Sequence, residues 1–338
     1  METLIYTSNT IDAINDLLKN DYQKILILSD KNLYVLYEKE INSIKSHFGS
    51  KAIVYIISPG ENSKSIANVM EIVNFMISNG FQRDSLIINY GGGVVSDLGG
   101  FISSNYLRGI DYINIPTSII GQIDAALGGK TAINTFGIKN NFGSFYSPLA
   151  VVLNPNYIKT LNQLELDNGY GEVFKYQILM GDKELIFKEY NEILEACVKY
   201  KTSLVKKDKK DLGLRQYLNL GHTIGHGIEA SQKIPHGVAI AYGTLATIDI
   251  AKSLSLTDNN FIKEAANIFN QIGINYTNEI KNLNKSDVIN KINHDKKIKR
   301  GKINWILPIN WGKIIQESID QEVWVESLDK LIRGELFE

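Results

Sequence analysis

Short runs of apolar, often β-branched residues recur along the first half of the chain, and each ends at Gly, Ser or Asp. They are KILILSD (24–30), AIVYIIS (52–58), SLIINYG (85–91) and YINIPTS (112–118). Runs of this length and composition predict β-strands. Helical patterns lie between them, such as residues 63–80, which end on a glycine suited to a helix C-terminus. Because near-continuous apolar strands alternate with helices, we expect a parallel sheet covered on both faces.

The pattern changes near residue 160, where the strand signals fade. Helical periodicity then covers residues 169–180, 184–207, 221–231, 238–254 and 261–273. Only INWILP (303–308) resembles a late strand, and an irregular segment is the alternative. We therefore expect an α/β N-terminal domain with a Rossmann-like parallel sheet, residues 1–160, and a mainly α-helical C-terminal domain, residues 161–338.

Composition narrows the class of protein. The 338 residues are 44% hydrophobic and 22% charged, as in ordinary globular domains. A net charge of −1 argues against nucleic acid or an anionic membrane as a partner. We find no signal peptide at the N-terminus and no apolar run of the ~18 residues that span a membrane. Cys197 is the only cysteine, which excludes an internal disulfide and fits a cytoplasmic protein.

Two glycine clusters follow predicted strands. YGGGVVSDLGG (90–100) lies between a strand and a helix, where glycine lets a phosphate approach backbone N–H groups. The spacing is not the usual G-x-G-x-x-G, so for this cluster alone a simple tight turn is an equal alternative. LGGK (127–130) adds the cation Lys130, and PGENSK (59–64) adds Glu61 and Lys64 at the same expected sheet edge. Together these loops favour an anion site.

Three of the five histidines, His222, His226 and His236, lie within fifteen residues of one another. The first two share a helix face, but no glutamate lies between them, which excludes the H-E-x-x-H protease motif. A lone histidine is most often a hydrogen-bonded core residue, yet three among glycines indicate a metal site. Two imidazoles and one carboxylate would form an open zinc site, and spacing leaves both Glu172 and Glu229 as candidates.

Cationic side chains are scattered through the same segments, together with two asparagines. This set suits a small, highly anionic substrate with phosphate or carboxylate groups, although long basic side chains also line ordinary surfaces. The residues are Arg108, Lys130, Lys139, Lys175, Lys201, Arg215, Asn140 and Asn219.

Taken together, the motifs resemble the 3-dehydroquinate synthases of the sugar phosphate cyclase family. The resemblance runs from about Asp30 to about Pro308. It is carried, in order, by PGENSK, GGGVVSD, YLRGIDYINIPTS, QIDAALGGKTAIN, KNNFGSFYSP, GYGEVFKY, GLRQYLNLGHTIGHGIE, HGVAIAYG and HDKK.

The resemblance implies a cytoplasmic lyase of the shikimate pathway, commonly a homodimer, that uses NAD and one divalent metal, zinc or cobalt. Its substrate would be 3-deoxy-D-arabino-heptulosonate 7-phosphate, and its products 3-dehydroquinate and phosphate. In this family NAD⁺ oxidises one hydroxyl, phosphate is eliminated, NADH returns the hydride, and an aldol step closes the ring.

The same resemblance assigns roles to residues. Glu172, His222 and His236 match the metal ligands, so His226 would serve the substrate rather than the metal. Asp124, Lys175, Lys201 and His226 match the catalytic set around the reacting hydroxyls. The substrate's carboxylate and phosphate would be bound by Lys130, Arg215, Arg108, Asn140, Asn219 and Lys296 or Lys297. Arg108 would reach the neighbouring subunit's site. The NAD site is matched by Asp30, Asn32, Glu61, Lys64, Gly92, Gly93, Val94, Asp97, Thr117, Ser118, Lys130, Lys139 and Thr160.

Several positions depart from the family pattern. Val238 replaces a usual glutamate, which puts the orientation of a metal ligand in question. Ser118 keeps the hydroxyl of a usual threonine. Ala125 and Ala126 lose two hydroxyls, and Ile138 stands where glycine is usual.

Three other functions compete with this interpretation. Sister cyclases of the 2-deoxy-scyllo-inosose or valienone type act on substrates without a carboxylate and tend to lose the residues that match Arg215 and Asn219, which this chain keeps. A metal-dependent polyol dehydrogenase would need fewer anion-binding residues. A non-catalytic binding protein would not need the metal, NAD and substrate residues together.

Overall fold

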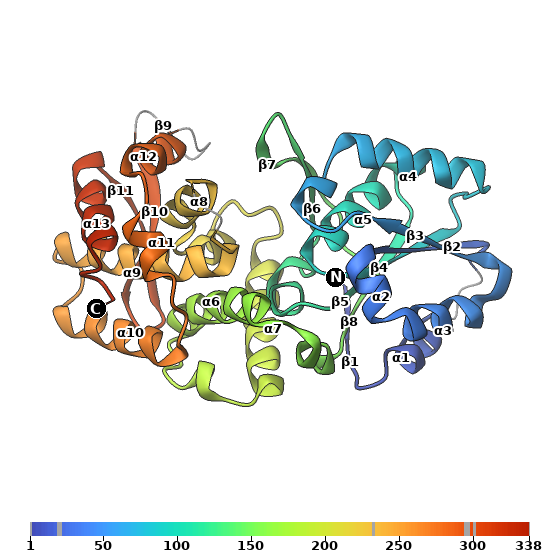
Figure 1. Cartoon of the computed structure of the whole chain (residues 1–338), viewed down its shortest axis with the longest axis horizontal. Coiled ribbons are helices and arrows are strands. Elements are labelled where there is room, and N and C mark those ends of the chain that lie inside the picture. Colours follow the sequence, from blue (N-terminus) through green and yellow to red (C-terminus); the bar gives the residue numbers. More distant parts are fainter. Residues whose placement is uncertain (1, 19–21, 232–233, 294–297, 300–301, 338) are drawn as a thin grey trace. The chain divides into compact units, whose positions relative to one another are not determined.

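The computed structural model describes residues 2–18, 22–231, 234–293, 298–299 and 302–337. The chain forms two compact units. In Figure 1 the colours follow the sequence from blue at the N-terminus to red at the C-terminus. Unit 1 comprises residues 1–161 and 201–206, and unit 2 comprises residues 162–200 and 207–338. Helix α7 (Tyr190–Lys207) therefore contributes to both units.

Unit 1 is built on a six-stranded sheet in which every pairing is parallel. The strand order is β1-β8-β5-β4-β2-β3. The four strands expected from the sequence are present, and β1 and β8 were not predicted because each has only four residues. The bounds are β1 (Thr3–Tyr6), β2 (Lys24–Asp30), β3 (Ala52–Ile57), β4 (Ser85–Gly91), β5 (Asp111–Pro116) and β8 (Ala150–Leu153).

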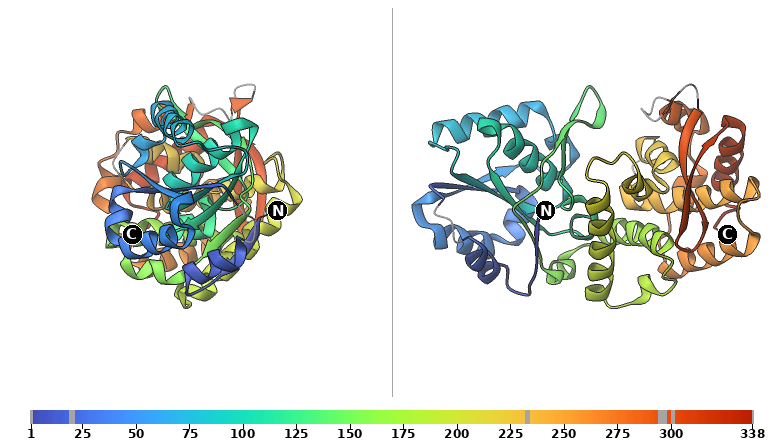
Figure 2. Two further views of the ribbon diagram at one scale, coloured as in Figure 1. Left: turned by 90° about the vertical axis from the view of Figure 1, so that its right-hand side faces the viewer. Right: turned by 180° about the vertical axis from the view of Figure 1, so that it is seen from behind.

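Helices cover both faces of this sheet, as the two views of Figure 2 show. Side chains of β2 alternate between two cores: Ile25 and Ile27 pack on one face, and Leu26 and Leu28 on the other. Because both faces are buried, the strand reads as a continuous apolar run. The helices are α1 (Thr10–Leu17), α2 (Lys31–Leu36), α3 (Glu38–Phe48), α4 (Ile66–Ser78) and α5 (Gly93–Asn105).

A separate antiparallel hairpin joins β6 (Lys130–Thr135) to β7 (Ile138–Phe145). Its turn residues Phe136 and Gly137 both have positive φ, 52° and 75°. Phe142 of β7 lies against Phe101 of α5, with ring centroids 5.4 Å apart. The hairpin thereby carries Lys130, Lys139 and Asn140 on unit 1.

Unit 2 is mainly helical and is organised around α9 (His236–Ser253), whose residues from Gly237 to Ala251 are all buried. The segment 238–254 was expected to be helical, and its lack of a polar face follows from this central position. The other helices are α6 (Gln163–Met180), α8 (His222–Ser231), α10 (Asn259–Ile272), α11 (Thr277–Lys281), α12 (Lys285–Asn293) and α13 (Gln321–Arg333).

One sequence prediction in unit 2 needs correction. Residues 184–207 do not form one helix: a 3-10 turn at Leu185–Phe187 ends in extended backbone at Lys188 before α7 begins. The break lets Leu185 and Ile186 enter the core. The strand predicted at INWILP is confirmed: it lies within β10 (Lys302–Asn310), which pairs with β9 (Ile298–Lys299) and β11 (Lys313–Ile319). We did not predict β11 because most of its side chains are polar or exposed.

Among the described residues, no helix combines the length and the apolar character that crossing a membrane requires.

Candidate metal centre and nucleotide-binding site

The carboxyl ends of the parallel strands of unit 1 meet at one edge of the sheet, the usual ligand edge of such sheets. Asp30 ends β2 and caps α2, accepting hydrogen bonds from the N–H groups of Asn32 (2.9 Å) and Leu33 (3.0 Å). Gly92 precedes the first turn of α5, whose free N–H groups can face a phosphate. Thr117 and Ser118 follow β5 at the same edge. The predicted NAD residues Asp30, Asn32, Gly92, Gly93, Val94, Asp97, Thr117 and Ser118 are thus brought together on unit 1.

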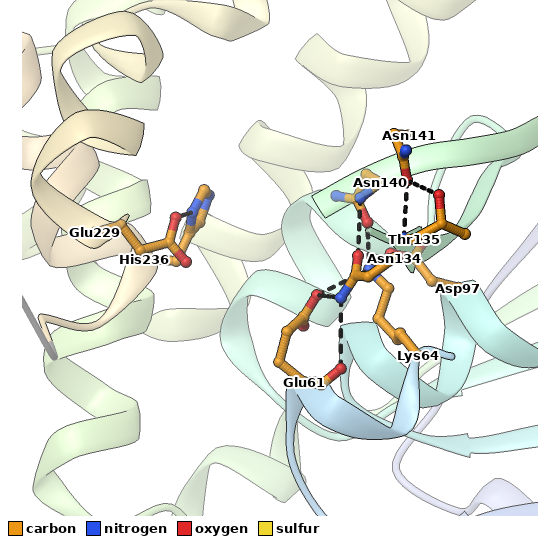
Figure 3. Close-up of polar contacts among 9 residues, drawn as sticks. All are labelled: Glu61, Lys64, Asp97, Asn134, Thr135, Asn140, Asn141, Glu229 and His236. Carbon is orange, nitrogen blue, oxygen red and sulfur yellow. Dashed lines mark hydrogen bonds and ion pairs between the residues drawn. The ribbon is translucent and has the colours of Figure 1, made fainter. Parts of the chain in front are cut away.

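Lys64 is the central cation of this edge (Figure 3). Its side chain is 4% exposed, and its Nζ lies 2.7 Å from Asp97 Oδ2 and 3.5 Å from Glu61 Oε1. It also donates a hydrogen bond to the side-chain oxygen of Asn140. Burial alone would lower the pKa of Lys64, but the carboxylates of Asp97 and Glu61 outweigh burial and raise it. Lys64 is therefore a charged, fully enclosed ammonium group.

Asn134 links the loop of Glu61 to the hairpin that carries Asn140. Its amide donates to Glu61 Oε1 (2.7 Å), and its side-chain oxygen accepts from the backbone N–H of Asn140 (2.8 Å). Its own N–H donates to the carbonyl of Lys64 (2.8 Å). Asn140 has φ of +50°. A predicted phosphate residue and three predicted NAD residues thus share one polar network, and we did not predict Asn134 as its connector.

Other predicted residues of unit 1 lie in different surroundings. Lys201 of α7 pairs with Asp124, with Nζ 2.8 Å from Oδ1, so two predicted catalytic residues are neighbours. Thr160 is exposed and hydrogen-bonds to Tyr37, while Lys130 and Lys139 are exposed on the hairpin.

Arg108 differs from the other predicted site residues of unit 1. It is exposed and precedes the start of β5, so it lies where the strands begin, opposite to the ligand edge. Its own chain therefore does not bring it to the nucleotide residues.

In unit 2, three helices bring together Glu172 of α6, His222 of α8 and His236 of α9. One ligand atom from each lies within 4.8 Å of the other two. The ring centroid of His222 lies 5.4 Å from that of His236 and 5.2 Å from that of His226, which is exposed. Two imidazoles and a carboxylate are a usual donor set for zinc.

His236 also belongs to a second grouping, with His226 and Glu229. Both carboxylates that the sequence left open therefore lie beside His236.

The hydrogen bonds of the rings decide which nitrogens remain for a metal. Nδ1 of His222 lies 3.1 Å from the carbonyl oxygen of Leu220, and Nδ1 of His236 lies 3.0 Å from Glu229 Oε2. If each Nδ1 carries the proton, each Nε2 keeps its lone pair. Burial holds the pKa of His222 well below its usual range, and the nearby charge of Lys175 lowers it further. A neutral imidazole is the form that binds metal.

Glu172 has one satisfied and one unsatisfied oxygen. The carboxylate is 1% exposed, and its Oε1 accepts a hydrogen bond from Lys175, which is 0% exposed and also donates to the carbonyl of Leu218 (2.9 Å). Within the described structure, the buried Oε2 has no hydrogen-bond partner. A buried carboxylate oxygen without a partner is costly, and a divalent cation beside the two histidines would satisfy it. The donor set therefore fits zinc or cobalt.

Two further predicted residues of unit 2, Arg215 and Asn219, lie on the segment between α7 and α8. Arg215 is 1% exposed, and its Nη1 donates to the carbonyl of Lys209 (3.1 Å). Asn219 is half-buried and ends the same 3-10 segment, Leu214–Asn219. Lys296 and Lys297 lie outside the described residues.

A family profile described as 3-dehydroquinate synthase N-terminal matches residues 54–168, and its C-terminal counterpart matches residues 169–298. The chain belongs to the 3-dehydroquinate synthase family. The 3-dehydroquinate synthase of Clostridium tetani is 35% identical over 87% of this chain and 83% of its own length. That of Alkaliphilus oremlandii is 35% identical over 96% of this chain and 94% of its own.

Solved structures show the same fold at lower identity. A 2-deoxy-scyllo-inosose synthase, crystallised with carbaglucose-6-phosphate, NAD⁺ and Co²⁺, has a TM-score of 0.86, 22% identity, and coverage of 97% of this chain and 96% of its own. The 2-epi-5-epi-valiolone synthase of Streptomyces hygroscopicus, with NAD⁺ and Zn²⁺, has a TM-score of 0.86, 19% identity, and coverage of 99% and 97%.

Four of the positions that depart from the expected family pattern have defined surroundings in the structure. Val238 is fully buried in α9, so no carboxylate is available there. The hydroxyl of Ser118 accepts a hydrogen bond from Gly121 N–H (3.1 Å), so it retains a polar role. A Cβ on Gly93 would lie 3.2 Å from that of Ala125, so these small residues let α5 approach the next loop closely. Ile138 is half-exposed at the start of β7.

Proposed function

We propose that this chain catalyses the 3-dehydroquinate synthase reaction, converting 3-deoxy-D-arabino-heptulosonate 7-phosphate to 3-dehydroquinate and phosphate. The observation that carries the proposal is the convergence of Glu172, His222 and His236 in a member of this family. The reaction is a phosphate elimination and ring closure, so the enzyme is a lyase of the shikimate pathway.

Glu172 and the Nε2 atoms of His222 and His236 would hold one zinc or cobalt ion, leaving a coordination position open for substrate. The bound metal supplies Lewis-acid polarisation of the hydroxyl that is oxidised. Lys175 would orient the Glu172 carboxylate through their buried ion pair. His226, which is exposed beside the two ligand histidines, would hydrogen-bond a substrate hydroxyl.

The ligand edge of unit 1 would bind NAD. Bound NAD would supply reversible hydride transfer, with no net oxidation of the substrate. Asp30 would bind ribose hydroxyls from the end of β2, and the first turn of α5 after Gly92 would face the pyrophosphate. Asp97 and Glu61 would hold the ammonium group of Lys64 in place at this edge.

The remaining charged residues suit a substrate with both a carboxylate and a phosphate. We assign the carboxylate to Lys130 and Arg215, and the phosphate to Arg108, Asn140, Asn219 and Lys296 or Lys297. Asp124 and Lys201 would orient the reacting hydroxyls, because their ion pair fixes each side chain in one position. Retention of Arg215 and Asn219 favours this substrate over those of sister cyclases.

We also propose a cytoplasmic homodimer. Arg108 lies at the edge of the sheet opposite to the ligand edge, so a second copy of the chain would have to receive it. Small anionic molecules, and not nucleic acid or membranes, would be its ligands, given the net charge of −1.

The decisive test follows phosphate release from 3-deoxy-D-arabino-heptulosonate 7-phosphate by the purified protein with catalytic NAD⁺. We expect phosphate release that stops on chelation and returns with zinc, without accumulation of NADH. Stoichiometric NADH would indicate a polyol dehydrogenase. If the protein loaded with metal and NAD releases no phosphate from this substrate, sugar phosphates without a carboxylate become the substrates to test.

Replacing Arg215 tests the carboxylate assignment. We expect Arg215→Ala to raise KM far more than it lowers kcat, because the substrate carboxylate loses a buried cationic partner, at a cost of about 2–5 kcal/mol. Arg215→Lys should recover part of the loss, since lysine keeps the charge without the guanidinium fork. Thermal unfolding of both variants controls for the lost bond to the Lys209 carbonyl. Unchanged kinetics in a folded Arg215→Ala variant would indicate a substrate without a carboxylate.

A further inference from the structure

A carboxylate outside the proposed ligand set holds the ring of His236. Oε2 of Glu229, near the end of α8, lies 3.0 Å from Nδ1 of His236, and Figure 3 shows this oxygen directed at the ring. The Glu229 side chain is only 14% exposed, which limits competition from water. Because a carboxylate only accepts, Nδ1 is the donor in this bond.

This contact determines how His236 could bind a metal. An imidazole that donates from Nδ1 presents a lone pair at Nε2, and a carboxylate partner also increases its basicity. For His222 the carbonyl of Leu220 fulfils the same role. His236 begins α9 and takes its partner from a side chain on another helix, so its orientation depends on Glu229.

The backbone of His236 is positioned separately from its ring. The N–H of the next residue, Gly237, donates to Asn168 Oδ1 (2.7 Å). A Cβ on Gly237 would lie 1.9 Å from the carbonyl oxygen of Asn168, so only glycine permits this approach. Asn168 precedes Glu172 by one turn of α6, so α9 begins against the helix that carries the proposed carboxylate ligand. The remaining freedom at His236 is rotation of its side chain, which the contact with Glu229 restricts.

Residue 238, two positions after His236, offers the ring no polar partner. It is a valine whose side chain is 0% exposed. The orientation of His236 therefore cannot come from residue 238.

We propose that Glu229 is a positioning residue of the metal centre: its carboxylate fixes the ring of His236 so that Nε2 faces the metal. The inference rests on the proposed function, because it takes His236 to be a ligand. It assigns Glu229 no contact with the metal or the substrate.

The test measures zinc affinity by competition with a chromogenic chelator in the full-length wild-type, Glu229→Ala and Glu229→Gln proteins. We expect Glu229→Ala to bind zinc roughly 10–100-fold more weakly, as is typical for loss of such a partner. Glu229→Gln should lose less, because its amide oxygen still accepts the bond. The visible absorption of the cobalt-loaded Glu229→Ala protein should also shift. Glu195→Gln, an exposed change on α7, is the charge-matched control and should behave like wild type.

Three outcomes for the Glu229 variants would overturn the inference. Unchanged zinc affinity and an unchanged cobalt spectrum in Glu229→Ala would show that His236 needs no such partner. If both variants lost zinc affinity equally, and by more than this range of roughly 10–100-fold, Glu229 would be a direct ligand, as the grouping with His226 requires. A loss that appears only together with a lower melting temperature of both apo variants would show a purely structural role. Failure of the wild-type protein to bind zinc would instead overturn the proposed function.

Discussion

His236→Ala is expected to abolish zinc retention and turnover together. The change removes one of three donors, so its effect on metal affinity should exceed the roughly 10–100-fold loss typical of an outer partner. It also leaves Glu229 without its ring partner. The fold should persist, because His236 is the first residue of α9 and its side chain is about one-third exposed.

The measurements are metal content after dialysis, phosphate release with added zinc, and thermal unfolding of the apo protein. His47→Ala is the matched control, because His47 is exposed on α3 in unit 1, where its ring lies beside that of Phe48. We expect that variant to retain zinc and activity. A fully active, metal-replete His236→Ala protein would contradict the ligand assignment.

Lys175→Met is expected to destabilise the apo protein strongly. Its ammonium group and the Glu172 carboxylate are both almost completely buried, at 0% and 1% exposure. Breaking a buried pair by removing one partner typically costs about 3–5 kcal/mol, because the remaining charge is uncompensated. For a domain of this size, that corresponds to a fall in melting temperature of roughly 6–20 °C.

Zinc should reduce the difference in melting temperature between Lys175→Met and wild type. The metal would place a new positive charge beside Glu172, and its binding would stabilise the folded state. Glu172→Gln combined with Lys175→Met should recover much of the apo stability, because the double variant leaves no buried charge unpaired. Lys252→Met, an exposed change on α9, controls for loss of a lysine. An apo Lys175→Met protein as stable as wild type would contradict a stabilising role for the buried Lys175–Glu172 pair.

Much of the α/β unit could be predicted from local patterns. The strands β2, β3, β4 and β5 are buried on one or both faces, so their apolar runs are visible in the sequence. Their helices end at glycine or begin at capping side chains such as Ser65, which are also local signals. By contrast, β1 and β8 are too short to stand out, and β11 is too polar.

The residue types of the metal centre were also visible, but not their arrangement. Three histidines among glycines indicated a metal site, and the spacing placed His222 and His226 on one helix face. Spacing could not choose between Glu172 and Glu229, because the choice depends on how α6, α8 and α9 pack. That packing brings Glu229 to Nδ1 of His236, and it leaves Oε2 of Glu172 buried without a partner in the described structure.

The nucleotide edge shows the same division between sequence and structure. Local patterns placed Glu61, Lys64 and Asp97 on loops that follow parallel strands, and parallel pairing brings such loops to one edge. The link to Asn140 runs through Asn134, more than seventy residues from Glu61, on a hairpin that the sequence did not reveal. The sequence therefore indicated which residue types the site contains and that parallel strands bring their loops to one edge. Which side chains lie within reach of a common hydrogen bond, ion pair or metal ion was decided only by tertiary packing, because those contacts join elements distant along the chain.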